Sequence, residues 1–390
     1  MPQEEMLEVG KMQQKMVIGI PREDQETESR VPLTPEAVEI LTGHGHRVLI
    51  ETGAGKAANY LDNHYSELGA EILEHRKEVM KADVILKITP PGIEDIQMMK
   101  DRVTVFSSFQ VKTYDDPAYI RNLMAKKATA ISLEQIQDEH NCYPVIRSMS
   151  GIAGNTAVLI AAEYLSNVRG GKGVMLGGIA GITPTEVIIL GAGTAAEFAV
   201  RAALGLGASV KVFDQSVHRL RRLQNAVGQN IPTSIFHAKV LEKSLLSADV
   251  VIGALRNEDD HPGFYVTEEM VTVMKKGAVI IDISIDRGGC IATSELRTQK
   301  DPVFTKHGVV HYCVPNIPSR VARTASIAIS NVFAPLLRSC GQMGGVSHQL
   351  KEMVGLRHGV YIYNGILTNE VIGNRLGIPS KDIDLLMAAF

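Results

Sequence analysis

Residues 185–214 read TEVIILGAGTAAEFAVRAALGLGASVKVFD, and this stretch decides the fold. A continuous apolar run at 187–190 leads directly into Gly191, Gly193 and Ala196, which have Gly-x-Gly-x-x-Ala spacing. A helix is expected over 195–207, and the apolar run after it ends in Asp214. Strand, glycine turn, helix and strand in this order predict a βαβ unit with a parallel sheet.

The glycine turn is typical of a dinucleotide site, because an acidic residue ends the second strand. Gly191 permits the tight turn, Gly193 lets a pyrophosphate approach the backbone, and Ala196 keeps helix and strand close, while the helix N-terminus attracts the phosphates. Asp214 would accept hydrogen bonds from the adenosine ribose and repel a 2′-phosphate, which favours NAD over NADP. The alternative is a glycine turn in another kind of α/β protein. The candidate cofactor-binding residues here are Gly191, Ala192, Gly193, Thr194, Ala195, Ala196 and Asp214.

Short apolar runs alternate with amphipathic stretches along the whole chain, which predicts an α/β fold. Helices are expected over 34–45, with Thr34 as the cap, over 150–168 and over 324–340. We place one domain at 145–322 and a second at 1–144 with 323–390. Strands are expected at 15–21, 47–55, 82–88, 102–109, 128–134, 185–193, 209–214, 248–255, 278–284 and 308–314.

Composition excludes several classes of function. The 390 residues carry a net charge of −3, and no basic stripe is present, so a nucleic acid or an anionic membrane is not expected as the partner. The four cysteines form no Cys-x-x-Cys pair and lack zinc-ligand spacing, so we expect reduced thiols and no metal site. The polar N-terminus and the absence of about 18 uninterrupted apolar residues predict a cytoplasmic protein without membrane insertion.

Several blocks of sequence resemble alanine dehydrogenase and the related alpha subunit of proton-translocating transhydrogenase. These blocks are GIPREDQETESRVPLTP (19–35), VILKI (84–88), MSGIAGNTA (149–157), the stretch at 170–199, VIIDISIDRGGCIATS (279–294) and HYCVPNIPSRVARTAS (311–326). The resemblance implies two Rossmann-like domains, with the NAD-binding domain at 145–322 inserted into a discontinuous substrate domain.

The resemblance also implies roles for single residues. Arg30 matches the family arginine that holds the substrate carboxylate, which a guanidinium can grip with two parallel hydrogen bonds; a surface arginine is the alternative. Asp286 matches the aspartate near the nicotinamide ribose and the substrate, although an aspartate here could also cap a helix. Ser150, Asn316 and Ile317 match positions around the cofactor, where such residues also suit turns and caps.

The chain departs from the family at the two titratable positions of the substrate domain. In alanine dehydrogenases the strand matched by VILKITPP ends in Lys-x-Lys-x-Pro, so Lys87 takes the first lysine and Thr89 takes the second, which polarises the substrate carbonyl. The catalytic histidine of the family aligns with Gln110 in VFSSFQVK. Threonine and glutamine do not titrate usefully near neutral pH. Lys87 either compensates in part or only lines the rim of the site.

Two functions therefore stay open, and we predict the first of them. The first is an NAD-dependent dehydrogenase of the alanine dehydrogenase type, acting on a small amino acid and its 2-oxo acid with weak or altered activity. The second is an NAD(H)-binding relative without that chemistry, either a transhydrogenase-like nucleotide domain or an NAD sensor. The resemblance implies a homo-oligomer, a hexamer if the chain is like the dehydrogenases and a dimer if it is like the transhydrogenase domain.

Overall fold

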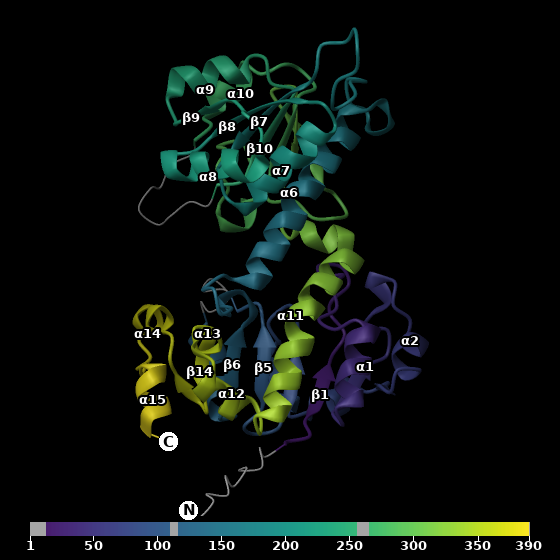
Figure 1. Ribbon diagram of the computed structural model, residues 1–390, viewed down its shortest axis with the longest axis vertical. Coiled ribbons are helices and arrows are strands. Elements are labelled where there is room, and N and C mark those ends of the chain that lie inside the picture. The colour runs from purple at the N-terminus through teal and green to yellow at the C-terminus, as the bar shows by residue number, and fades with distance from the viewer. Residues whose placement is uncertain (1–12, 110–115, 256–264, 390) are drawn as a thin grey trace, which may run out of the picture. The chain divides into compact units, whose positions relative to one another are not determined.

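The computed structural model describes residues 13–109, 116–255 and 265–389 (Figure 1). It divides the chain into two compact units, which we call the first unit (Met1–Ile146 with Ala322–Phe390) and the second unit (Arg147–Val321). The second unit is thus inserted into the first along the chain. The functional roles given to the two parts above stay predictions.

The sheet of the second unit has the strand order of a dinucleotide-binding fold. Its order is β12-β13-β11-β10-β7-β8-β9, and only β12 runs antiparallel to its neighbour. The six parallel strands, numbered along the chain, therefore lie in the order 3-2-1-4-5-6. The strands are β7 (Glu186–Leu190), β8 (Ser209–Phe213), β9 (Thr233–Ser234), β10 (Val250–Gly253), β11 (Val279–Asp282), β12 (Val303–Lys306) and β13 (Val309–Tyr312).

Helices cover both faces of this sheet, which explains the uninterrupted apolar runs. Side chains of a strand alternate between the faces, so Val187 and Ile189 join one hydrophobic cluster while Ile188 and Leu190 join another. The first cluster includes residues of α6 and α7, and the second includes residues of α9 and α10. The helices of the unit are α6 (Pro144–Leu165, which begins in the first unit), α7 (Thr194–Gly205), α8 (Val217–Val227), α9 (Ala238–Leu245) and α10 (Glu268–Thr272).

The first unit repeats the same topology. Its sheet has the order β15-β14-β6-β5-β4-β1-β2-β3, in which β1 to β6 are parallel and again lie as 3-2-1-4-5-6. Both domains are therefore Rossmann-like, as the fold prediction states. The strands are β1 (Val17–Ile20), β2 (Arg47–Glu51), β3 (Glu71–Leu73), β4 (Val84–Leu86), β5 (Thr104–Ser107), β6 (Thr129–Ser132), β14 (Val360–Tyr363) and β15 (Ile366–Leu367).

The long helix α11 (Ala322–Gln342) lies across the sheet of the first unit (Figure 1). Phe333 of α11 packs edge-to-face on Phe106 of β5, with ring centroids 5.6 Å apart. Its Ser326 and Ser330 hydroxyls accept the backbone N–H groups of Val31 and Thr34 at 2.9 and 3.0 Å. These bonds fix the segment that carries Arg30. The other helices are α1 (Pro35–Gly43), α2 (Asp62–Ser66), α3 (Arg76–Val79), α4 (Ile93–Met98), α5 (Pro117–Ala125), α12 (Val346–Glu352), α13 (Val354–Arg357), α14 (Glu370–Leu376) and α15 (Ile383–Ala389).

Most expected elements are present, and the differences have local causes. Thr34 caps α1 by accepting the Ala37 N–H. Helix α6 begins at Pro144 rather than near residue 150, because proline fits the first turn of a helix. The helix α6 is also long and apolar enough to cross a membrane by length and composition, and half of its most apolar window is buried inside the protein. A core helix of a globular protein passes the same test.

Candidate functional site

The glycine turn joins β7 to α7 and is held by backbone hydrogen bonds. Gly191 N–H donates to the Phe213 carbonyl at 2.6 Å, which ties the turn to the neighbouring strand β8. Gly193 is the N-cap of α7, so the first N–H groups of this 12-residue helix open toward the turn. The buried Ala196 lies in the cluster between helix and sheet.

The two glycines are required for different reasons. Gly191 has φ +107°, and a Cβ there would lie 2.7 Å from the Ala254 carbonyl oxygen, so the fold itself requires glycine. Gly193 has φ −83° and ψ −172°, which any residue adopts, and a Cβ there would meet nothing within 4 Å. A ligand lying in this open space is a reason for glycine at 193. The turn therefore fits a bound pyrophosphate.

A third glycine brings another helix close to the turn. A Cβ at Gly154 of α6 would lie 1.9 Å from the Ala195 carbonyl oxygen, so only glycine lets α6 approach the first turn of α7. Ser150 lies one helical turn earlier on α6 and is half-buried. Its predicted place near the cofactor stays a prediction.

Asp214 is almost completely buried and bonds to the backbone around it. It is 1% exposed, and its Oδ2 accepts the Ala192 N–H at 2.7 Å while its Oδ1 accepts the Ser216 N–H at 2.8 Å. A carboxylate has about four acceptor positions, and these two bonds use two of them, so the predicted role with the ribose stays a prediction. Asp214 thus also braces the glycine turn. Arg222, which the sequence analysis did not single out, donates to the Ala192 carbonyl at 3.2 Å from the other side.

Asp286 lies in the short helix η5 (Ile285–Arg287) just beyond the end of β11, and it is exposed. The loop that carries it is organised around the fully buried Asp282. This carboxylate accepts the Ser284 N–H and hydroxyl at 3.1 and 2.9 Å, the Cys290 N–H at 3.2 Å and the Ser294 hydroxyl at 2.8 Å. Burial raises the pKa of Asp282, and these bonds partly offset it. Sequence reasoning missed Asp282, although it ends the apolar run VIID.

Asn316 and Ile317 lie a few residues beyond β13, the last parallel strand of the second unit. Asn316 has φ +58°, a left-handed conformation that asparagine tolerates better than most residues. Ile317 begins the short helix η6 (Ile317–Val321) and belongs to the hydrophobic cluster of the sheet, with 2% of its surface exposed. The contacts of both residues with a cofactor stay predictions.

In the first unit, Lys87 is a buried, paired cation rather than a residue on an open rim. Strands β1 and β4 are parallel neighbours, so Glu23, just beyond β1, meets Lys87, just beyond β4. Lys87 Nζ lies 2.5 Å from Glu23 Oε2, and each residue is 5% exposed. Glu23 Oε1 accepts the Ile88 N–H at 2.5 Å. Sequence reasoning missed Glu23, which lies inside the block at 19–35.

Thr89 completes this cluster, and it is the half-buried member. Its hydroxyl donates to Glu23 Oε2 at 2.5 Å and accepts from Lys87 Nζ. Burial raises the pKa of Glu23, while the Lys87 charge and the bonds from Lys87 and Thr89 oppose this shift without cancelling it. We call Glu23, Lys87 and Thr89 the strand-end triad.

Arg30 is held by a neighbour in the sequence. Its Nε and Nη2 donate to the two carboxylate oxygens of Glu28 at 2.8 and 2.6 Å, a bidentate pair. The Arg30 side chain is 11% exposed and that of Glu28 is 1% exposed, so the alternative of a surface arginine is wrong. Burial alone would lower the pKa of Arg30, but Glu28, together with the charges of Glu23 and Glu134, raises that pKa above its usual value. Gln110 lies outside the described residues, so its role stays a prediction.

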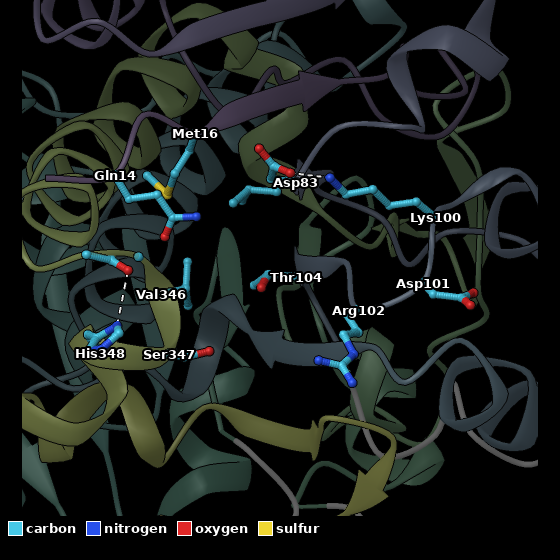
Figure 2. A pocket seen from close by; sticks show the side chains of 13 residues that line it. Gln14, Met16, Asp83, Lys100, Asp101, Arg102, Thr104, Val346, Ser347 and His348 are labelled. Carbon is cyan, nitrogen blue, oxygen red and sulfur yellow. Dashed lines mark hydrogen bonds and ion pairs between the residues drawn. The ribbon is translucent and has the colours of Figure 1, made fainter. Parts of the chain in front are cut away.

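Two hollows in the first unit differ in their position on the sheet. One, of about 440 Å³, is lined by Met16, Asp83 and Thr104 at the amino ends of β1, β4 and β5, and by Arg102 and His348 (Figure 2). The amino ends of parallel strands lie opposite their carboxyl ends, so this hollow is remote from the strand-end triad. Among the described residues, no group of three His, Cys, Asp or Glu side chains could hold a metal ion.

The second hollow, of about 750 Å³, lies beyond the ends of β2 and β3, and Arg76 lines it. The Arg76 guanidinium binds Asp95 in a bidentate pair at 2.6 and 2.9 Å, and it binds Glu51 at 2.8 Å. Burial alone would raise the pKa of Asp95, but Arg76 outweighs it and holds that pKa below its usual value. Arg76 is therefore committed to structural carboxylates.

Comparisons with known proteins agree with this geometry. Residues 19–153 match the family model "Alanine dehydrogenase/PNT, N-terminal domain", and residues 157–370 match "Alanine dehydrogenase/PNT, C-terminal domain". The chain belongs to the alanine dehydrogenase/PNT family. It is 36% identical over 363 residues to the alanine dehydrogenase of Bacillus subtilis, covering 93% of this chain and 95% of that one. It is 35% identical to that of Methanococcus maripaludis over 93% of this chain and 97% of that one.

Solved structures show the same likeness. A structure titled L-alanine dehydrogenase superposes with a TM-score of 0.86 at 31% identity, covering 93% of this chain and 99% of the other. A transhydrogenase from Sinorhizobium meliloti superposes with a TM-score of 0.77 at 23% identity, over 91% of this chain and 99% of the other. The second match shows the shared fold alone.

Proposed function

We propose that this protein is an NAD-dependent dehydrogenase that interconverts a small amino acid, L-alanine first among the candidates, with its 2-oxo acid and ammonia. The observation that carries this proposal is the similarity to alanine dehydrogenases through both units, over 93% of the chain. The resemblance seen in single motifs thus extends over both units of the chain.

The second unit supplies the cofactor site. The open space at Gly193 and the N-terminus of α7 suit the pyrophosphate, and Asp214 suits the adenosine ribose. NAD, when bound, accepts a hydride from the substrate carbon. Ser150, Asn316 and Ile317 are proposed to line the cofactor site, and the exposed carboxylate of Asp286 is proposed to face the reacting groups.

The first unit supplies the substrate anchor. Glu28 binds the Nε and Nη2 groups of Arg30, and we propose that the same guanidinium also binds the carboxylate of the substrate. Glu28 also fixes the plane of the guanidinium, which reduces the entropy lost when the substrate binds. This anchor suits a small 2-oxo acid or the amino acid that corresponds to it.

The rate should lie below that of the relatives, because Thr89 and Gln110 take the positions of the lysine and the histidine. Loss of one general acid–base typically costs ~10²–10⁴-fold in rate. Lys87 supplies a positive charge at the strand end, but its ammonium is already paired with Glu23. The same two positions favour a second candidate function, an NAD(H)-binding protein without dehydrogenase chemistry.

A substrate screen distinguishes the two candidates. NADH absorbance is followed with pyruvate and ammonia first, then with other small 2-oxo acids, and NADH binding is measured in parallel. Asp286→Asn should lower turnover while NADH still binds. Asp301→Asn, a change at an aspartate whose side chain is 72% exposed, is the control and should leave both unchanged. Tight NADH binding without turnover of any substrate would favour the second candidate.

We also infer a cytoplasmic homo-oligomer that acts on a free small molecule, without nucleic acid as a partner. The net charge of −3 gives no electrostatic attraction to nucleic acid or to an anionic membrane. Light scattering distinguishes a hexamer from a dimer, and sedimentation with vesicles tests membrane binding.

A further inference from the structure

The strand-end triad contains a hydroxyl between two buried charges. Glu23 and Lys87 are each 5% exposed, whereas Thr89 is half-buried and carries the only hydroxyl of the three. The Thr89 oxygen accepts from Lys87 Nζ and donates its own proton to Glu23 Oε2 at 2.5 Å. A hydroxyl oxygen has two acceptor positions. One is used by Lys87, and the second is suited to a water molecule on the exposed side.

We propose that Thr89 relays a proton between the reacting water and Glu23, and so replaces the lysine that the family has at this position. This proposal rests on the proposed function. When water attacks the substrate iminium, the oxygen–carbon bond forms and the π electrons of the C=N bond move to nitrogen, which becomes a neutral amine. The water proton passes to the Thr89 oxygen, and the Thr89 proton passes to Glu23 Oε2. When ammonia leaves, the proton returns from Glu23 through Thr89 to the amine nitrogen and the carbon–nitrogen bond breaks. The hydroxyl oxygen then forms the carbonyl and gives its proton to the departing ammonia, so ammonium is released and the triad is restored.

The surroundings of Glu23 suit this task. Burial raises its pKa, and the charge of Glu28 acts in the same direction, while Lys87 and Thr89 act against both. Arg30 interacts electrostatically with Glu23 and with Glu134, and Lys87 interacts in the same way with Asp95. A carboxyl whose pKa lies above its usual value is a better general base near neutral pH than an ordinary glutamate. Lys87 favours the anionic form of Glu23 and orients it.

The central test compares Thr89→Val with Thr89→Ser. Valine keeps the shape of threonine but has no hydroxyl, so steady-state turnover should fall ~10²–10⁴-fold. Hydride transfer precedes the water step, so a rapid burst of NADH should persist in Thr89→Val. Serine should restore turnover. Thr52→Val is the matched control, because the Thr52 hydroxyl lies at the end of β2 and bonds only the Leu73 carbonyl, at 3.3 Å, among the described residues.

A second measurement separates proton transfer from a merely structural role. The parent enzyme should show an acidic limb in its pH–rate profile, where turnover rises as Glu23 loses its proton. In Glu23→Gln this limb should be absent, and in Thr89→Val it should be absent too, because the path from the reacting water to Glu23 is broken. If Glu23→Gln fails to fold, the Thr89 pair still decides the question.

The outcomes are distinct. Parent-like turnover and an unchanged pH profile in Thr89→Val would overturn the relay, while the dehydrogenase function would stand. Equal losses in Thr89→Val and Thr89→Ser would also overturn it, since the hydroxyl would then not be the cause. If the parent turns over no amino acid although NADH binds, the proposed function fails and the relay fails with it.

Discussion

Two alanine substitutions in the glycine turn should separate folding from cofactor binding. Gly191→Ala should mainly lower the stability of the fold, and Gly193→Ala should mainly weaken NADH binding. At Gly191 a Cβ would force φ +107° on alanine and would press against the Ala254 carbonyl at 2.7 Å. The left-handed conformation costs ~1–2 kcal/mol and the overpacking ~1–3 kcal/mol. Gly191→Ala should therefore lower the free energy of unfolding by about 2–5 kcal/mol.

At Gly193 the backbone is extended and the space is empty, so the fold should tolerate alanine. The loss of a good N-cap and the smaller entropy of the unfolded chain nearly cancel, within about 1 kcal/mol. The new methyl group would instead occupy the space that we assign to the pyrophosphate. NADH affinity should then fall at least ~10-fold, about 1.4 kcal/mol.

Urea denaturation and calorimetric titration with NADH measure the two effects separately. Equal NADH affinity of Gly193→Ala and the parent would show that the open space is not the cofactor site. Stability of Gly191→Ala equal to that of the parent would show that the turn is not constrained as the structure describes.

Four further predictions follow from the same structure. NADH should bind at least ~10-fold more tightly than NADPH, and Asp214→Ala should narrow this gap; equal dissociation constants for the parent would contradict it. Arg30→Ala should weaken binding of small 2-oxo acids by ~2–5 kcal/mol without changing NADH affinity, and unchanged pyruvate binding would remove Arg30 from the site. Thr89→Lys with Gln110→His should raise alanine turnover by orders of magnitude and non-additively; a double variant that binds NADH but stays inert would favour the nucleotide-binding alternative. The pKa of Asp95 is lowered in the folded state, so its contribution to stability is present above pH 3.8 and is lost as the pH falls further. In Asp95→Asn, the free energy of unfolding should therefore depend less steeply on pH below that value.

The sequence predicts the architecture well because buried parallel strands have a strong signal. Runs such as VIIL at 187–190 are apolar on both faces, and this one is followed by the helix α7 (Thr194–Gly205). The edge strands β9 (Thr233–Ser234) and β15 (Ile366–Leu367) have two residues each, which is too short for a period of two to be visible. They were therefore not predicted.

The candidate site was predicted only in part, because partners distant in sequence decide its chemistry. Lys87 can be read as a free cation from its own strand, but Glu23 lies 64 residues earlier and meets it only through the pairing of β1 with β4. The sequence predicts a substrate carboxylate as the partner of Arg30, but Glu28 already binds one edge of its guanidinium. Acidic residues in polar loops carry no periodic signal, so their burial follows from the fold alone.

The most direct test of the dehydrogenase function is the incorporation of isotope-labelled ammonium into alanine. The purified protein is incubated with pyruvate, labelled ammonium and NADH, and labelled alanine is measured together with the loss of NADH absorbance. We predict one labelled alanine for each NADH oxidised, at a rate that is low but abolished in Arg30→Ala. NADH binding with no labelled alanine, and no product from other small 2-oxo acids, would contradict the function proposed for this protein.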